Sequence, residues 1–296
     1  MKAAVFLGCS VPVRAANYEM SVRSVARRLG VELTDLEDFG CCGYPIAAVS
    51  ELTAMAMAAR NLAVARGRGL PVVCLCSACS GFLREAAHRL AQDEKLLREV
   101  NEALSAVGIS YEAGGSVEIK HVARLLVEDV SLERIGKEIR TPLSGIRVAV
   151  HYGCHYLRPR NLAGSEEDPE NPTSLDRLVE VTGGAAVPYE QLLGCCGGGI
   201  LGIKEEAALL VSRKKLDCIA GEKVDAMVTV CPFCSVMFEG NQKKIEKTFG
   251  GTYNLPVLYY PQLLGLAMGI DPEELGFSMN RIKAAALLDK IAQKRS

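Results

Sequence analysis

Two adjacent cysteines followed by glycine occur twice in this sequence, once in each half of the chain. Each pair is preceded by a lone cysteine and followed, at a similar distance, by two cysteines that are separated by two residues. The first set consists of Cys9, Cys41, Cys42, Cys76 and Cys79, and the second consists of Cys154, Cys195, Cys196, Cys231 and Cys234. In a reducing cytosol, cysteines at motif spacings indicate metal or redox chemistry rather than structural disulfides.

Three kinds of site could use five cysteines. A structural zinc ion takes four ligands in a tetrahedron, and adjacent cysteines are poor partners on one small ion because their side chains diverge. A site based on thiol redox chemistry is possible, because a disulfide between adjacent cysteines is strained and labile. It gives no reason, however, for the C-x-x-C to recur at a matched distance. An iron–sulfur cluster is large enough for adjacent thiolates to bind different iron atoms, so iron–sulfur chemistry is favoured.

The two cysteine sets belong to an internal duplication. Cys154 lies 145 positions after Cys9, and Cys231 lies 155 positions after Cys76, in the same order and with similar surroundings. Such a repeat predicts two copies of one structural unit. Two further cysteines, Cys74 and Cys218, fall outside the pattern and are interpreted as small apolar residues of the core.

The elements around the cysteines predict parallel sheets. Apolar runs predict buried strands at 3–8, 71–75, 147–152 and 226–230, with a weaker strand at 31–36. Periodic segments predict helices near 14–29, 50–66, 80–107, 174–182, 203–220 and 234–247. Alternating strands and helices are typical of parallel α/β units. Four of the cysteines directly follow strands, at the sheet edge where ligands collect in such folds. The five cysteines of each half can therefore converge.

Composition excludes several classes of function. The chain has 296 residues, 49% of them hydrophobic and 23% charged, with a formal net charge of -1. It is therefore typical of a soluble globular protein, and it has no basic excess that would indicate nucleic-acid binding. No stretch approaches the roughly 20 apolar residues of a membrane span. The opening run MKAAVFLGCS is expected to form a strand rather than a signal peptide, which implies a cytoplasmic protein.

The chain is expected to divide near residue 140 into domains 1–140 and 141–296. The linker is the polar segment 136–146, which contains proline and glycine. Residues 160–174 are rich in turn formers and acids and predict an inserted loop in the second domain. The tail from 278 onwards predicts an exposed basic helix.

The motifs GCHYLRP, GCCGGG and CPFC, with their counterparts in the first half, resemble the duplicated cysteine-rich CCG domain found in the B subunit of heterodisulfide reductase. The resemblance covers nearly the whole chain. It implies two CCG domains related by a pseudo-twofold axis, each a small, mainly parallel sheet flanked by helices. It also implies that each domain binds a noncubane 4Fe-4S cluster through five cysteines, and the two ligand sets are those given above.

The resemblance implies the catalytic iron–sulfur subunit of a disulfide reductase, acting on the mixed disulfide of coenzyme M and coenzyme B or on a related disulfide. Its expected partners are a ferredoxin-like subunit and a flavoprotein subunit of the same complex, with neither nucleic acid nor a membrane span involved. A substrate cavity is expected between the halves, bounded by both Cys-Cys-Gly turns. The alternative is an electron-transfer CCG subunit of a lactate-oxidising, glycolate-oxidising or quinone-linked complex. Five cysteines in both halves favour the reductase.

Two residues near Cys154 are candidates for roles in the reaction. His155 directly follows this cysteine and could serve as a general acid, hydrogen-bond a cluster sulfur or be purely structural. Arg158 could bind an anionic group of the substrate. His151, at the end of a strand, is expected to pack in the core.

Overall fold

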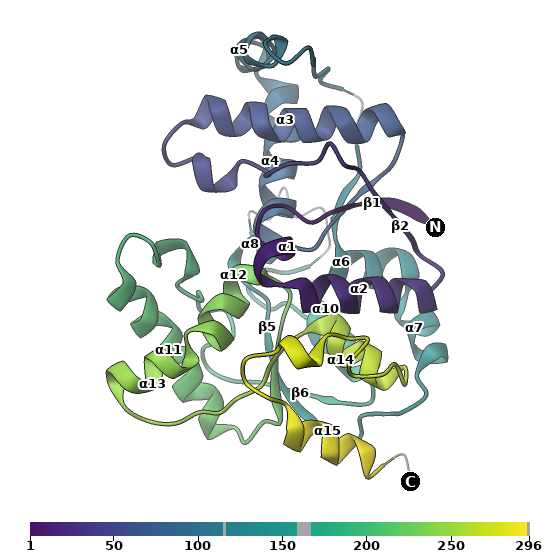
Figure 1. Cartoon of the computed structure of the whole chain (residues 1–296), viewed down its shortest axis with the longest axis vertical. Coiled ribbons are helices and arrows are strands. Elements are labelled where there is room, and N and C mark those ends of the chain that lie inside the picture. Colours follow the sequence, from purple (N-terminus) through teal and green to yellow (C-terminus); the bar gives the residue numbers. More distant parts are fainter. Residues whose placement is uncertain (115–116, 159–166, 295–296) are drawn as a thin grey trace.

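Short apolar runs form the centres of two four-stranded parallel sheets (Figure 1). The computed structural model describes residues 1–114, 117–158 and 167–294. The strand order is β2-β1-β3-β4 in one sheet and β6-β5-β7-β8 in the other. The strands are β1 Lys2–Phe6, β2 Glu32–Asp35, β3 Val72–Cys74, β4 Ile119–His121, β5 Arg147–His151, β6 Ala185–Val187, β7 Ala226–Thr229 and β8 Val257–Tyr259. The predicted α/β class, with one small parallel sheet in each half, is confirmed.

Helices pack around the two sheets, and three cysteines of the two sets, Cys79, Cys154 and Cys234, lie within them (Figure 1). The helices of the first half are α1 Val11–Arg14, α2 Ala16–Arg28, α3 Glu51–Arg68, α4 Ser77–Gln92, α5 Glu94–Ser105, α6 Val122–Arg124 and α7 Leu132–Glu138. Those of the second half are α8 Cys154–Leu157, α10 Ser174–Glu180, α11 Glu205–Gly221, α12 Pro232–Ser235, α13 Gln242–Phe249, α14 Tyr260–Ala267 and α15 Ala285–Ala292. Short 3-10 turns occupy Tyr44–Ile46, Gly198–Ile200 and Phe277–Met279, and π-helical turns occupy Leu125–Val130 and Val236–Gly240.

The hydrophobic core runs through both halves instead of stopping at a boundary. Successive strand residues point to opposite faces, so Val5 belongs to one apolar cluster and Phe6 to the other. In the second sheet, Val150 joins the first of these clusters and Ala149 joins the second. Each cluster therefore spans both sheets. The division near residue 140 remains a prediction, although each sheet lies wholly on one side of it.

Several predicted elements differ from those in the structure. The helix expected over 80–107 is broken at Asp93, whose carboxylate accepts a hydrogen bond from Leu96 N and caps α5. Strands β4, β6 and β8 were not predicted: β4 contains a lysine and a histidine, β6 is mostly alanine, and β8 runs directly into α14, so none of them stands out as a bounded apolar run. The tail helix α15 is amphipathic, with Leu287 and Ile291 buried, instead of wholly exposed. The first part of the expected inserted loop, 160–166, lies outside the described residues.

Tyr18 on α2 joins the two halves. Its ring stacks on Tyr259 with a centroid separation of 4.1 Å, and its hydroxyl donates to the Val230 carbonyl at 3.3 Å. Val230 directly precedes Cys231, and its carbonyl also lies 2.9 Å from His121 Nε2. Two residues of the first half, Tyr18 and His121, therefore hold the backbone at the start of the second C-x-x-C motif.

Tyr18→Phe is expected to lower the free energy of unfolding by about 1 kcal/mol, because it removes one hydrogen bond but keeps the stacked ring. Urea unfolding monitored by circular dichroism would measure the change. A loss above about 3 kcal/mol would contradict this account, since it would mean that the variant also disturbs the packing of the ring.

Candidate cofactor site

The ten cysteines of the two sets meet in one continuous group. Side-chain interactions join each thiol to the next, and all twelve cysteines of the chain are free of disulfides. Along these interactions the order is Cys9, Cys41, Cys42, Cys79, Cys76, Cys231, Cys234, Cys196, Cys195 and Cys154. We call the first five the N-terminal quintet and the last five the C-terminal quintet. The quintets adjoin at Cys76 and Cys231, whose side chains interact and whose neighbours, Ser77 and Val230, are joined by a hydrogen bond.

Parallel strand pairing explains this convergence. β1 pairs with β3, so the loops that follow them, which carry Cys9 and Cys76, leave the sheet at the same edge. β5 pairs with β7 in the same way and brings Cys154 next to Cys231. Both C-x-x-C motifs begin a helix, with Cys76 at the N-cap position of α4 and Cys231 at that of α12. The partial positive charge of a helix N-terminus favours a thiolate at this position.

The Cys-Cys-Gly turns present backbone N–H groups to sulfur. Gly43 N lies 3.5 Å from Cys41 Sγ, and Gly197 N lies 3.3 Å from Cys195 Sγ. Both glycines have positive φ angles, 97° and 82°, which other residues adopt only with strain. N–H groups directed at sulfur stabilise the thiolate form, which is the form that binds metals.

The electrostatics of the quintets favour a positively charged occupant. Hydrogen bonding from Cys234 and Cys76 lowers the pKa of Cys231, whereas interactions with Cys196 and Cys231, together with burial, raise the pKa of Cys234. Burial, the largest cause, and the negative charge of neighbouring thiolates raise the pKa of Cys41 to about 11. Five thiols in contact cannot all ionise unless cations balance their charge. Soft metal ions such as the iron of an iron–sulfur cluster would provide that balance, so this donor set fits the predicted cofactor.

A small pocket opens onto the N-terminal quintet. Its lining includes Cys9, Cys42, Cys76 and Cys79, and Phe233 contributes from the second half. The expected cavity was to be bounded by both Cys-Cys-Gly turns. The observed pocket is lined instead by the first Cys-Cys-Gly turn, through Cys42, and by the C-x-x-C motif of the second half, through Phe233.

His155 lies between the two halves. Its Nδ1 is 3.3 Å from Cys154 Sγ, and its ring contacts the Tyr44 ring edge to face at 4.7 Å. Tyr44 follows the first Cys-Cys-Gly turn, so His155 of one half touches the site of the other. Arg158 is exposed, its backbone N–H donates to the Cys154 carbonyl, and it borders residues 159–166, which are not described.

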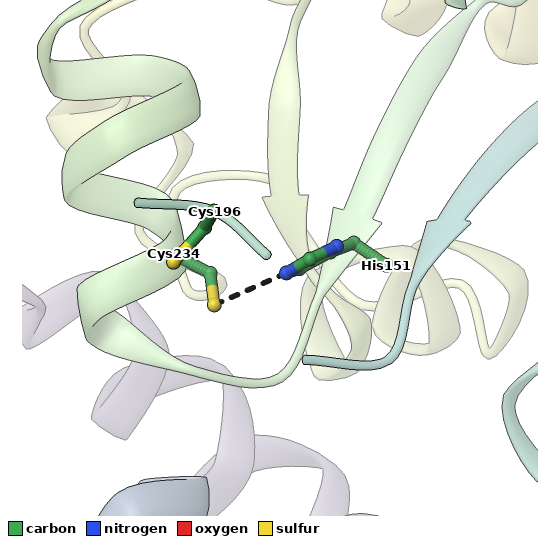
Figure 2. Close-up of side chains that lie close together, drawn as sticks. All are labelled: His151, Cys196 and Cys234. Carbon is green, nitrogen blue, oxygen red and sulfur yellow. Dashed lines mark hydrogen bonds between the residues drawn. The ribbon is translucent and has the colours of Figure 1, made fainter. Parts of the chain in front are cut away.

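Two further residues lie at the C-terminal quintet, Lys215 and His151, and neither was predicted to belong to the site. His151 packs edge to face on Phe238, as expected, but its Nε2 also lies 3.2 Å from Cys234 Sγ (Figure 2). The donor atoms of His151, Cys196 and Cys234 all lie within 4.8 Å of one another. Lys215 Nζ lies 2.9 Å from His151 Nδ1. Burial lowers the pKa of Lys215 to about 8 and that of His151 well below its ordinary value. One feature of the sequence could have indicated Lys215: this lysine stands among the apolar positions of the helix predicted over 203–220.

Across the described residues, the structure has no helix that is long and apolar enough to cross a membrane.

Comparison with known proteins supports the duplication. The model of the cysteine-rich domain family named CCG matches residues 3–84 and 148–239. The B subunit of a ferredoxin:CoB-CoM heterodisulfide reductase from Methanosarcina mazei is 35% identical over 98% of this chain and 97% of its own. A protein from Archaeoglobus profundus, named as similar to the B subunit of heterodisulfide reductase, is 36% identical over 93% of both. The membrane anchor subunit of an 8-methylmenaquinol:fumarate reductase from Wolinella succinogenes is 34% identical over 96% and 98%.

The fold also occurs in a solved structure. A hypothetical protein from Helicobacter pylori aligns over 95% of this chain and 52% of its own, with a TM-score of 0.76 and 18% identity. At that identity the likeness concerns the fold alone. The Methanosarcina and Wolinella relatives are subunits of reductases, and the matched domain occurs once in each half of this chain. This chain therefore belongs to the CCG cysteine-rich domain family, carries the domain twice, and is a homologue of the heterodisulfide reductase B subunit.

Proposed function

We propose that this protein is the catalytic iron–sulfur subunit of a heterodisulfide reductase-like complex, which reduces a disulfide to two thiols. The observation that carries the proposal is that the two quintets adjoin: Ser77 Oγ, next to Cys76, donates to the carbonyl of Val230, next to Cys231, at 3.5 Å, and the Cys76 and Cys231 side chains interact. Cleavage of a disulfide consumes two electrons and two protons and yields two thiols. A protein with two matched sulfur-rich sites that face each other is suited to that stoichiometry, because each sulfur of the substrate has a site of its own.

Each quintet would hold one noncubane 4Fe-4S cluster. The N-terminal cluster would be held by Cys9, Cys41, Cys42, Cys76 and Cys79, and the C-terminal cluster by Cys154, Cys195, Cys196, Cys231 and Cys234. When bound, such clusters supply single electrons and iron sites with affinity for sulfur. The chain contributes the thiolates, six of which are buried, and the N–H groups of Gly43 and Gly197 that are directed at sulfur.

We assign proton delivery to His155 and substrate binding to Arg158. His155 lies at the edge of the C-terminal quintet and against Tyr44, where its imidazole can protonate a departing thiolate. The exposed guanidinium of Arg158, four residues after Cys154, can pair with a carboxylate, sulfonate or phosphate group of the substrate.

His155→Gln is expected to lower kcat about 100-fold, the size of effect typical when a general acid is lost, and to leave the iron content unchanged. Steady-state assays with reduced viologen and iron analysis would measure both. His88→Gln, which changes an exposed histidine on α4, is the matched control. An unchanged kcat in His155→Gln would make this residue structural, and a fall in iron content would make it a support for the cluster.

The relatives are subunits of larger reductases, so electrons are proposed to arrive from partner proteins. By analogy with the heterodisulfide reductases, the partners are a ferredoxin-like subunit and a flavoprotein subunit. The proposal places the complex in the cytoplasm. The disulfide is the mixed disulfide of coenzyme M and coenzyme B or a related compound.

The fumarate reductase relative favours a second candidate function. That protein is named as a membrane anchor of a quinol-linked enzyme and is similar to this chain over nearly its whole length. An electron-transfer protein of this kind would pass electrons between partners without disulfide chemistry. Both functions would require iron–sulfur clusters, so iron content alone does not separate them.

Anaerobic purification followed by iron and acid-labile sulfide analysis tests the cofactor. About eight irons per chain is the expected result for two 4Fe-4S clusters. Assays of viologen oxidation with a panel of disulfides, with the thiol products counted, then test the reaction. Two thiols formed for each disulfide consumed support the proposed reductase. Full iron loading without turnover of any disulfide supports the electron-transfer function, and zinc or disulfides in place of iron would overturn both candidates.

A further inference from the structure

The two halves match in their cysteines but differ in the residues behind them. The Cys-Cys-Gly turns pack on equivalent helix positions, because a Cβ on Gly43 would lie 2.4 Å from Ala54 O and one on Gly197 would lie 2.6 Å from Ala208 O. Seven residues further along each helix, α3 has Asn61 where α11 has Lys215. At the last position of the central strand, β1 has Phe6 where β5 has His151.

Lys215 places a positive charge in the core beside the C-terminal quintet. Its residue is 1% exposed. Its Nζ donates to Leu192 O and to His151 Nδ1, both at 2.9 Å, and lies over the rings of Tyr189 and Phe238. Among the described residues, no carboxylate forms a salt bridge with Lys215. A buried cation needs a nearby anion to offset its desolvation, and the nearest candidates are the C-terminal thiolates, led by Cys234.

The contact with Lys215 determines which ring nitrogen of His151 carries the proton. An ammonium group has three donors and no acceptor, so Nδ1 of His151 must accept the hydrogen bond. The proton of the neutral imidazole is then on Nε2, which faces Cys234 Sγ at 3.2 Å. His151 is therefore a hydrogen-bond donor to this sulfur, and its role differs from that of a metal ligand.

The equivalent residues of the N-terminal half, Asn61 and Phe6, are neutral and make different contacts. Asn61 donates to Cys41 O and accepts from Gly40 N, both at 2.9 Å, and thereby holds the turn. Phe6 packs edge to face on Phe39 with a centroid separation of 5.0 Å. Within the described parts of the chain, no histidine donates to Cys79, the counterpart of Cys234.

We propose that Lys215, acting through His151, makes the C-terminal quintet the site that accepts the first electron. This inference rests on the proposed iron–sulfur function. A positive charge and an N–H group beside a cluster ligand stabilise an added electron, and both features are confined to one half. The first electron, from a one-electron donor of the ferredoxin class, would then stay in the C-terminal half while the second enters the N-terminal half. No bond forms or breaks at either residue, and Lys215 is a positioning residue.

The test is a potentiometric titration, monitored by electron paramagnetic resonance, of the full chain purified without oxygen. Lys215→Met removes the charge, and His151→Phe introduces the residue found at the equivalent position of the first half. In each variant, the higher of two midpoint potentials is expected to fall by at least 59 mV, a tenfold change in a one-electron equilibrium, while the other is unchanged. Cys42→Ala, which should delete the N-terminal cluster, identifies the remaining signal as that of the C-terminal half.

Two controls isolate the effect of the buried charge. Lys214→Met removes an exposed charge from the neighbouring position of α11 and should leave both potentials unchanged. Lys215→Arg keeps the charge and should keep most of the higher potential. Equal shifts of both clusters, or no shift in Lys215→Met and His151→Phe, would overturn the inference. Loss of the C-terminal cluster from both variants would also overturn it, because the pair would then hold the cluster instead of tuning it. Absence of iron from the unmodified protein would instead refute the proposed function.

Discussion

Replacement of Cys76 by alanine is expected to halve the iron bound per chain and to abolish disulfide reduction. Cys76 is 2% exposed, occupies the N-cap position of α4, and its side chain interacts with those of Cys79 and Cys231. It is therefore the proposed ligand of the N-terminal cluster that lies next to the other quintet. Loss of one thiolate leaves four donors, and the alanine methyl cannot replace the metal–sulfur bond. Iron and sulfide analysis and the viologen-linked assay would measure the two effects.

Cys74→Ala is the matched control for this experiment. Cys74 is fully buried two positions before Cys76, at the end of β3, and lies outside the repeated pattern. Its replacement should cost about 1 kcal/mol of stability, a typical value for a point variant, and leave the iron content unchanged. Equal iron loss in both variants would show that disruption of the core, instead of ligand removal, explains the result. Full iron loading of Cys76→Ala would remove this residue from the ligand set.

Gly43→Ala is expected to lower the free energy of unfolding by about 3 kcal/mol or more and to prevent loading of the N-terminal cluster. The glycine has a φ of 97°, and an added Cβ would lie 2.4 Å from Ala54 O, which is backbone and cannot rotate away. The left-handed conformation costs about 1–2 kcal/mol for other residues, and overpacking adds about 1–3 kcal/mol. Relief of the clash would move the turn that presents Cys41 and Cys42. Chemical unfolding of the apoprotein and iron analysis would measure the two effects separately.

Gly199→Ala provides the contrast on the equivalent turn of the second half. A Cβ at Gly199 meets no atom within 4 Å, and the residue needs no positive φ. Its replacement should change stability by less than about 0.5 kcal/mol, as is usual for an open surface position. A near-neutral Gly43→Ala would mean that the turn can shift without cost, and the geometric role assigned to this glycine would then be wrong.

Much of the fold follows from local patterns in the sequence. The apolar runs that became β1, β3, β5 and β7 are buried on both faces, and parallel strands of this kind appear as continuous hydrophobic stretches. Helices α2, α3, α4, α10, α11 and α13 followed from their periodicity, whereas α7 and α14 were not predicted; α14 is buried on all sides and so has no polar face. Strands β4, β6 and β8 escaped prediction because none of them forms a bounded apolar run like that of the equally short β3, and only their pairing with remote strands marks them. The break at Asp93 was missed because helical periodicity continues across it.

The sequence by itself determined the duplicated cysteine pattern, the α/β class and the position of four cysteines directly after strand ends, because strand ends and spacings are local properties. Only the tertiary structure decided that Cys76 meets Cys231 and that Lys215 reaches Cys234 through His151. These contacts depend on how two sheets and a helix pack together, through long-range contacts such as the stacking of Tyr18 on Tyr259. Local periodicity shows which side of a helix is apolar, but the neighbours of a buried lysine are set by the packing of the whole chain.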